Sequence, residues 1–281
     1  MLARSRLDTP SHPSQPALRM TSGGVAVDVF QDSAALTHAA AERVAAHARE
    51  ATTLRGRFDW VLAGGRTPRP LYSLLGTEPY RSRLDWQRVH FFWSDERCVP
   101  PEHPNSNYRM VKEGLLDLVP LPTENVHRMR GEDEPEAAAD TYTDLLRTVR
   151  TNQAGTPRFD LILLGMGSDG HTASLFPGAA ALRETTRWVV PSYVEKLASF
   201  RLTLTAPVIN AAAHVLFLVQ GADKSARVAE VLGGPSHENA DDQETLPVRF
   251  IHPEDGDVRW LLDADAASLL PNEPDQERMP S

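Results

Sequence analysis

Residues 158–176 read RFDLILLGMGSDGHTASLF, and this stretch decides the fold class because it joins a buried strand to a glycine-rich turn. Phe159 and the apolar run 161–164, interrupted only by Asp160, predict a strand that is covered on both faces, as strands of parallel sheets are. The glycines that follow permit backbone conformations and a close approach of a ligand that a β-carbon would prevent. The stretch therefore predicts one strand and turn of an α/β protein.

Two polar residues of this turn, Asp169 and His171, are candidates for chemistry. In open α/β sheets ligands bind beyond the carboxyl ends of the strands, which is where these two residues fall. A tight turn that carries a solvated histidine is the alternative, and for a lone histidine it is the more common case. The stretch alone does not choose between them.

Working outward, the rest of the chain alternates between strand and helix patterns. Apolar residues at helical spacing predict helices at 33–50, 68–75, 105–118, 139–149, 207–212, 222–232 and 264–270. Apolar runs predict strands at 58–63, 89–93, 188–190, 200–205, 214–219 and 258–262. Thr67 is expected to cap the second helix, with Pro68 in its first turn. This order predicts a single Rossmann-like α/β domain, with a mainly parallel twisted sheet and helices on both faces.

The ends of the chain differ in composition from the middle. Residues 1–22 are rich in Pro, Ser and Arg and are expected to form a disordered tail, and residues 271–281 a polar one. The α/β domain is expected to span 23–270, with a flexible loop at 233–244. The first residues lack the apolar stretch of a secretory signal, and no segment is long and apolar enough to cross a bilayer.

The overall charge excludes some partners and sets a condition on others. With 29 Lys and Arg against 38 Asp and Glu, the formal charge is −9, which argues against nucleic acid and anionic membranes as partners. A phosphorylated substrate would need a local group of cations that opposes this field. The single cysteine, Cys98, allows no internal disulfide and indicates a reducing, cytoplasmic location.

Four segments, in order along the chain, resemble blocks of the 6-phosphogluconolactonase family. GMGSDGHTAS at 165–174 resembles the active-site signature of that family, and LAGGRTP at 62–68 its early glycine loop. DERCVP at 95–100 with HPNSNY at 103–108 resembles the second block, and RLTLT at 201–205 with GADK at 221–224 the fourth. The matches extend from about residue 28 to residue 270. Related sugar-phosphate isomerases share single blocks, but four in register are specific.

The resemblance implies hydrolysis of 6-phospho-D-glucono-1,5-lactone to 6-phosphogluconate without a cofactor, and we expect a monomer. Opening a lactone requires a base that activates water and donors that stabilise the oxyanion. An imidazole can accept a proton near neutral pH, so we expect His171 to be the base and Asp169 to fix its tautomer. No spacing of His, Cys and carboxylate residues suggests a metal site, so the reaction is expected to be independent of metal.

The other candidate site residues are expected to bind the substrate. Gly64, Gly65 and Thr67 would hold the phosphate with backbone amides, although an ordinary strand-to-helix turn is the alternative. Arg97 would contact phosphate or lactone oxygens, unless it pairs with Asp95 or Glu96 for structure alone. The remaining expected binding residues are Asp95, Asn107, Gly167, Arg201 and Lys224.

Several of these assignments have structural alternatives. Asn107 could cap the helix that follows it, and Arg201 and Lys224 could be surface charges after strands. The family usually has Ser or Thr at the position of Arg66, so a contact from Arg66 is in doubt. Lys196 is left out of the expected site because the pair Lys196-Leu197 departs from the Lys-Pro usual in that loop.

Two other functions are open. The first is an amino-sugar phosphate deaminase or isomerase, which would share Asp95, Asp169 and His171. Its Asn-Glu pair after the histidine is replaced here by Leu175 and Phe176, which removes an acid that handles protons. The second is a non-catalytic sugar-phosphate sensor fused to a DNA-reading domain, for which the N-terminal segment is too short.

Overall fold

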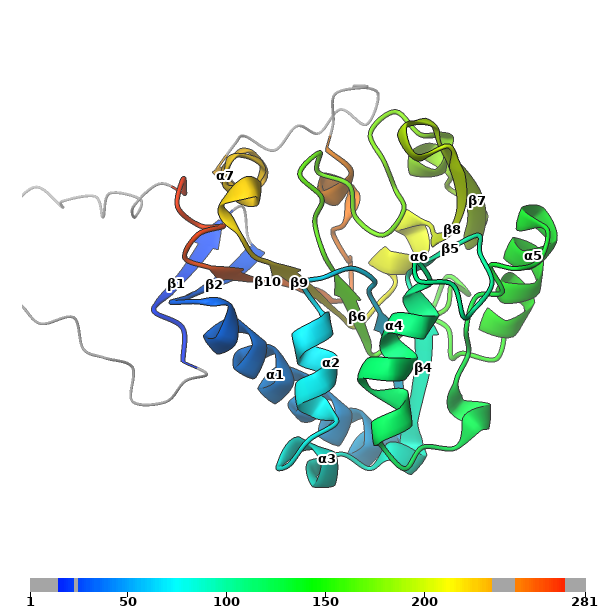
Figure 1. The fold of residues 1–281 in the computed structure, drawn as a ribbon, viewed down its shortest axis with the longest axis horizontal. Helices are drawn as coiled ribbons and strands as arrows, with labels where there is room; N and C mark the ends of the chain where they lie inside the picture. Colours follow the sequence, from blue (N-terminus) through cyan, green and yellow to red (C-terminus); the bar gives the residue numbers. More distant parts are fainter. Residues whose placement is uncertain (1–14, 23–24, 234–245, 271–281) are drawn as a thin grey trace, which may run out of the picture.

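The computed structural model describes residues 15–22, 25–233 and 246–270. The chain folds around a seven-stranded sheet with the strand order β1-β2-β10-β9-β6-β3-β4 (Figure 1). The strands are β1 (Leu18–Ser22), β2 (Val25–Phe30), β10 (Asp257–Asp263), β9 (His214–Val219), β6 (Leu161–Leu164), β3 (Phe58–Leu62) and β4 (Val89–Trp93). Only β1 is antiparallel to its neighbour. The predicted α/β class and mainly parallel sheet are confirmed.

Helices lie on both faces of this sheet. They are α1 (Ser33–Arg55), α2 (Arg69–Leu75), α3 (Tyr80–Arg83), α4 (Asn107–Gly114), α5 (Pro135–Leu146), α6 (Ala206–Asn210) and α7 (Ser225–Gly233). Figure 1 shows α1, α2 and α3 on one side of the sheet and α7 on the other. Among the described residues, no helix combines the length and apolar character that crossing a membrane requires.

The sequence shows why α1 begins and ends where it does. Asp32 caps its first turn by accepting a hydrogen bond from the Ala35 amide at 2.8 Å. The apolar positions Leu36, Ala40 and Val44 lie on the face buried against the sheet. The helix continues past the predicted end at residue 50 until Gly56, which adopts the left-handed conformation with φ of 73°.

A second sheet, of three antiparallel strands, lies beside the main one and was not expected. It has the order β5 (Asp95–Arg97), β8 (Ser199–Leu204) and β7 (Val189–Val194), and α5 packs against it. The segments near 190 and 200 are strands as predicted, but they pair with each other rather than with the main sheet. The β5–β8 ladder sets Arg97 opposite Arg201, so two of the family-like blocks meet there.

The structure corrects several predicted boundaries. The N-terminal tail ends earlier than residue 22, because Leu18–Ser22 forms β1 and pairs along its whole length with β2. The residues from 264 onward form turns instead of a helix, since the Asp263 carboxylate accepts the Ala266 amide and closes the chain on itself. The predicted loop at 233–244, after its first residue, and the tail at 271–281 lie outside the described residues.

Two helix starts also differ from expectation. Thr67 does not cap α2, which begins at Arg69 after Pro68 and has no side-chain cap. The cap of α4 is Ser106, whose hydroxyl accepts the Arg109 amide at 3.1 Å, so Asn107 is free for another role. The predicted helix at 105–118 breaks at Gly114, and a separate 3-10 turn follows over Leu116–Leu118.

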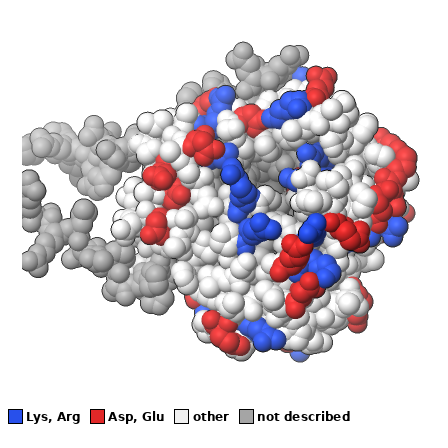
Figure 2. All heavy atoms as spheres, viewed as in Figure 1, with Lys and Arg blue, Asp and Glu red and all other residues white. Residues whose placement is uncertain are grey.

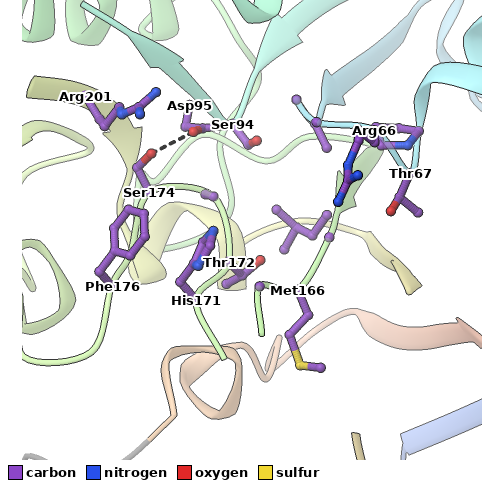
Figure 3. Close-up of a pocket in the computed structure, with 18 of the residues that line it drawn as sticks. Arg66, Thr67, Ser94, Asp95, Met166, His171, Thr172, Ser174, Phe176 and Arg201 are labelled. Atoms are coloured by element: carbon purple, nitrogen blue, oxygen red, sulfur yellow. Dashed lines mark hydrogen bonds between the residues drawn. The ribbon is translucent and has the colours of Figure 1, made fainter. Parts of the chain in front are cut away.

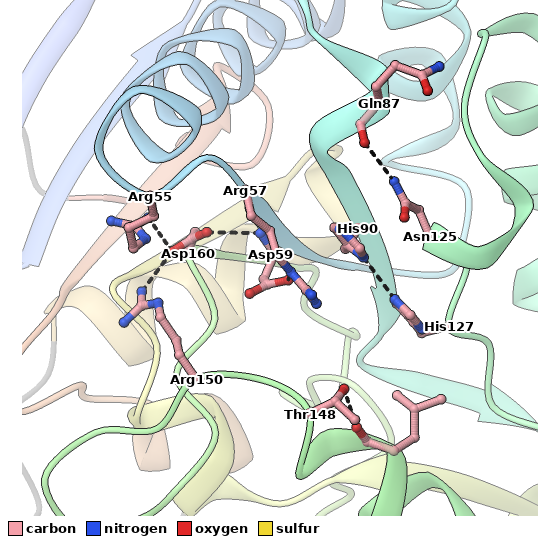
Figure 4. A network of polar contacts seen from close by, with 11 residues as sticks. Arg55, Arg57, Asp59, Gln87, His90, Asn125, His127, Thr148, Arg150 and Asp160 are labelled. Atoms are coloured by element: carbon pink, nitrogen blue, oxygen red, sulfur yellow. Dashed lines mark hydrogen bonds and ion pairs between the residues drawn. The ribbon is translucent and has the colours of Figure 1, made fainter.

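Two stacked histidines, His90 of β4 and His127, lie side by side near the start of β4 (Figure 4). Their Nδ1 and Nε2 atoms are 3.1 Å apart and their rings are nearly parallel. Burial, together with the positive charge of Arg57, lowers the pKa of both to about 4. Both rings are therefore neutral in the folded protein at neutral pH.

We expect these two histidines to destabilise the fold in acid. The unfolded chain takes up protons near pH 6.5, whereas the folded chain does so only near pH 4, so stability is lost as the pH falls through that window. After allowance for partial solvent exposure, each histidine contributes on the order of 1 kcal/mol to this loss. Urea unfolding of His90→Gln between pH 4 and 6.5 is expected to show a flatter dependence on pH than wild type. The exposed His252→Gln is the matched control, and an equal flattening there would contradict the assignment.

Candidate active site

A cavity of about 660 Å³ opens at the carboxyl edge of the main sheet. The segments after β3, β4, β6 and β9 all contribute to its wall, together with residues of the second sheet. The residues expected from sequence that line it are Gly64, Gly65, Thr67, Asp95, Arg97, Gly167, His171, Arg201 and Lys224. Figure 2 shows Lys and Arg side chains around a hollow on this side of the molecule.

The turn after β6 holds His171 against Asp169. The Nδ1 atom of His171 lies 2.5 Å from Oδ1 of Asp169, and the Nζ atom of Lys196 contacts the other carboxylate oxygen. Burial raises the pKa of Asp169, but the hydrogen bonds from His171 and Lys196 outweigh it and hold that pKa well below its usual range. The carboxylate is therefore charged at neutral pH and fixes the proton of the imidazole on Nδ1. Only Nε2 is left to accept a proton.

Gly167 and Phe176 hold the imidazole ring in place. A β-carbon on Gly167 would lie 2.1 Å from Nδ1 of His171, so the ring packs directly on the glycine. The ring of Phe176 stacks against that of His171, with centroids 4.2 Å apart (Figure 3). Nζ of Lys196 lies 4.8 Å from the centre of the Phe176 ring. The glycine is thus required here by the closeness of the imidazole.

The loop after β3 presents backbone amides to the cavity. The amides of residues 64–67 donate no hydrogen bond to any described residue, although they are next to the cavity. Gly64 cannot carry a side chain, because its β-carbon would lie 2.0 Å from Oδ1 of Asn107. Successive free amides of this kind attract anions. The loop is therefore suited to the anion binding that the sequence predicted, although Thr67 does not cap the helix.

Asn107 lies behind the cavity wall rather than in it. Its Nδ2 atom donates to the backbone and side-chain oxygens of Asp95, at 2.9 and 3.2 Å. Asp95 also accepts the Ser174 hydroxyl at 2.6 Å, which links the loop after β4 to the turn that carries His171 (Figure 3). Asn107 therefore supports Asp95 and packs against the glycine loop, and its predicted contact with the substrate stays a prediction.

Glu96 is buried and accepts the Ser106 hydroxyl at 3.0 Å. It accepts the amides of Arg97, Asn107 and Tyr108, at 2.8, 2.7 and 2.7 Å. Burial raises its pKa, and these hydrogen bonds oppose the rise. With its oxygens occupied in this way, Glu96 does not neutralise the guanidinium of Arg97, which contradicts the purely structural pairing that the sequence left open.

Arg97 and Arg201 form a pair of like charges across the β5–β8 ladder. The Nε atoms of both are buried and, within the described ranges, have no hydrogen-bond partner. Burial lowers the pKa of Arg201, and the neighbouring charge of Arg97 lowers it further. Two adjacent guanidinium groups with unpaired donors are expected to bind an anion. Arg66 lies on the opposite side of the cavity from Arg201 in Figure 3.

Lys196 is the main site residue that the sequence analysis left out. It lines the cavity and pairs with Asp169, although the loop that carries it departs from the usual pattern of the family. Its position follows from the β7–β8 turn, which could not be recognised because the second sheet was not predicted. Ser94, Ser174 and Phe176 also line the cavity. For Ser174 the available signal was the family-like block 165–174, and for Phe176 it was the departure from the deaminase pattern after the histidine.

The chain is similar to known proteins over most of its length. Residues 31–260 match the family model described as glucosamine-6-phosphate isomerases/6-phosphogluconolactonase. A 6-phosphogluconolactonase of Synechocystis is 42% identical over 87% of this chain and 98% of its own, and one of Nostoc is 40% identical over the same shares. A solved 6-phosphogluconolactonase structure from Thermotoga maritima superimposes with a TM-score of 0.69 at 30% identity, covering 84% of this chain and 98% of the other.

Proposed function

Because the chain belongs to the glucosamine-6-phosphate isomerase and 6-phosphogluconolactonase family, we propose that it hydrolyses 6-phospho-D-glucono-1,5-lactone to 6-phosphogluconate. This is the second step of the oxidative pentose phosphate pathway. The observation that carries the proposal is that His171 and the cations Arg97, Arg201 and Lys224 line the same cavity. An imidazole base and an anion site in one cavity suit a phosphorylated ester.

His171 is proposed to activate the attacking water. Nε2 takes a proton from water as the oxygen attacks the lactone carbonyl, and the imidazolium that forms is stabilised by the Asp169 carboxylate. The same proton can then pass to the ring oxygen as the carbon–oxygen bond breaks. Lys196 supports this cycle by keeping Asp169 charged, because it occupies the second carboxylate oxygen.

Two groups of cations and backbone amides are proposed to bind the negatively charged oxygens of the substrate. The amides of residues 64–67 with Lys224 form one group, and Arg97 with Arg201 the other. Five Lys and Arg against two Asp line the cavity, so it is positive within a chain of net charge −9. This local excess of positive charge opposes the negative field of the whole chain, as binding of a phosphorylated substrate requires.

The direct test is acid release from freshly prepared 6-phosphogluconolactone, measured above the spontaneous rate. The proposal requires acceleration by the wild-type protein, an unchanged rate after addition of a chelator, and no ammonia release from glucosamine 6-phosphate. Ammonia release would instead identify a deaminase. Binding of the lactone without acceleration would identify a sensor, and either result would refute the proposal.

Lys224 is expected to affect binding more than turnover. It lines the cavity, and its Nζ atom lies 3.2 Å from the Asp223 carboxylate. If Lys224 binds only the remote phosphate, removal of its charge should raise KM about tenfold or more and have a smaller effect on kcat. Steady-state kinetics of Lys224→Gln measure KM and kcat separately. Lys112→Gln is the matched control, since Lys112 pairs with Asp117 away from the cavity. A fall in kcat with KM unchanged would place Lys224 at the reacting carbonyl instead.

A monomer in the cytoplasm is the proposed working form. His171, Asp169 and the cations of the candidate site come together within one chain. The lone Cys98 is partly buried, and burial raises the pKa of its thiol to about 11, so it is protonated and unreactive at neutral pH. Light scattering after size-exclusion chromatography measures the mass of the protein in solution. A mass of two chains would contradict the proposed monomer.

A further inference from the structure

A second cavity, of about 400 Å³, lies at the amino edge of the main sheet, opposite the edge that holds the candidate active site. Helix α1 and the first residues of β9 and β10 contribute to its wall. Three side chains there bear metal-binding atoms: His47 and Glu50 from α1, and His214 from β9. None of them has a part in the proposed lactonase reaction.

These three side chains converge. Each offers one donor atom, and all three donors lie within 4.8 Å of one another. His47 and Glu50 are three residues apart on α1, which puts them on one face of the helix. Donors around a tetrahedral ion with 2.0 Å bonds are about 3.3 Å apart, so small side-chain rotations would complete the site. Glu50 is exposed, which leaves a path for an ion from solvent.

We propose that His47, Glu50 and His214 bind one divalent transition-metal ion, of which Zn²⁺ is the best match, at the amino edge of the sheet. Two imidazoles with one carboxylate form a ligand set that suits zinc and its neighbours, whereas Mg²⁺ and Ca²⁺ prefer oxygen ligands alone. Such an ion would tie α1 to β9, two elements far apart in the sequence. Its role would be structural and separate from the lactonase reaction.

Asp257 gives this cluster a feature that a chance grouping would lack. Its Oδ1 atom contacts Nδ1 of His214 and so fixes the ring proton on Nδ1. The unprotonated Nε2 is then free to bind a metal. Metal-binding histidines characteristically have such a carboxylate on their other nitrogen.

The arginines around the cavity are already paired. Arg55 and Arg150 both donate to Asp160, as Figure 4 shows, and Arg158 donates to the backbone oxygens of residues 211 and 255. Four carboxylates, those of Glu50, Asp160, Asp255 and Asp257, line the cavity against these three arginines, so the lining as a whole does not oppose a cation. The alternative to a metal site is a simple stacked pair of imidazoles, since the rings of His47 and His214 have centroids 4.1 Å apart. That pair would need neither Glu50 nor a metal.

The test uses the full, untagged protein after removal of metals with a chelator. Titration with Zn²⁺ by calorimetry, and with Co²⁺ by visible absorption, is expected to show one site per chain, while Mg²⁺ shows none. Saturating Zn²⁺, at about a hundred times Kd, should raise Tm by roughly 5 °C. Lactonase activity should stay the same with and without the ion.

Variants separate this site from the active site. His47→Ala and Glu50→Gln should abolish or greatly weaken Zn²⁺ binding, and Asp257→Asn should weaken it about 10- to 100-fold through the loss of the orienting carboxylate. His38→Ala, on the same helix but outside the cluster, is the matched control and should bind like wild type. His171→Asn should also bind like wild type, because its change lies at the other edge of the sheet.

Several results would overturn the proposal. They are the absence of a site with micromolar or tighter affinity, equal binding by wild type and both His47→Ala and Glu50→Gln, and loss of binding in His171→Asn. The last would place the ion at the catalytic histidine. Circular dichroism melting of each variant without metal shows whether it is folded, so failure to bind is not confused with failure to fold. None of these outcomes depends on whether the chain is a lactonase.

Discussion

His171→Asn is expected to lower kcat at least a hundredfold, with KM within a few-fold of wild type. The asparagine side chain has similar size but cannot accept a proton near neutral pH, so the attacking water loses its base. The cations proposed to bind the substrate should be unchanged, since Arg97, Arg201 and Lys224 do not contact His171 through any hydrogen bond of the described structure. Initial rates of acid release from the fresh lactone, corrected for spontaneous hydrolysis, measure the effect.

A companion variant separates the base from its support. Asp169→Asn keeps the imidazole but removes the charge that fixes its proton on Nδ1, so it too should lower kcat. The exposed His252→Asn is the matched control and is expected to leave both constants unchanged. Activity of His171→Asn close to wild type would remove His171 from the mechanism, and with it the proposed role of Asp169.

Gly167→Ala is expected to lower kcat by about a hundredfold without any change in a titratable group. The added carbon would lie 2.1 Å from Nδ1 and 2.2 Å from Cε1 of His171, and 2.7 Å from Oδ1 of Asp169. Real carbon atoms do not approach so closely, so the imidazole must move and its bond to Asp169 must break. A displacement of about 1 Å at a catalytic group commonly costs about a hundredfold in rate.

Gly165→Ala is a control two residues away in the same turn. Its β-carbon would meet only the Leu218 oxygen, at 3.8 Å, which is an ordinary contact. Near-normal kcat in Gly165→Ala together with a large loss in Gly167→Ala would show that the position of the imidazole matters, rather than the flexibility of the turn. Equal losses in both variants would contradict this account. Nitrogen NMR of the His171 ring reports directly on the bond to Asp169.

The main sheet was predictable because its strands are short, apolar and followed by turns. The run Leu161–Leu164 is wholly buried, as a strand of a parallel sheet should be, and the polar turn after it forms part of the cavity. The strands of the second sheet are less regular: β7 contains Pro191, and β5 is only three residues long and polar. The partner of β5 is β8, about a hundred residues further along the chain, and local patterns do not reveal such a pairing.

The residues of the cavity were largely foreseen, but their contacts were not. The family-like blocks pointed to His171, Asp169 and the cations, whereas the part of Asn107 in supporting Asp95 depends on how Gly64 packs against it. Lys196 was missed because its place depends on the turn between β7 and β8. The histidines of the amino edge were missed for a similar reason, since His47 and His214 meet only in the folded chain.

The pairing of β5 with β8 has a consequence for how activity is acquired during folding. This pairing closes a loop of about a hundred residues. Closing the loop costs chain entropy, which other contacts must offset before Arg97 and Arg201 become neighbours. A chain that ends before β8 lacks Arg201 and the strand that holds Arg97 beside it. Such a truncated chain could not form this pair of guanidinium groups, so synthesis must pass β8 before that part of the candidate site exists.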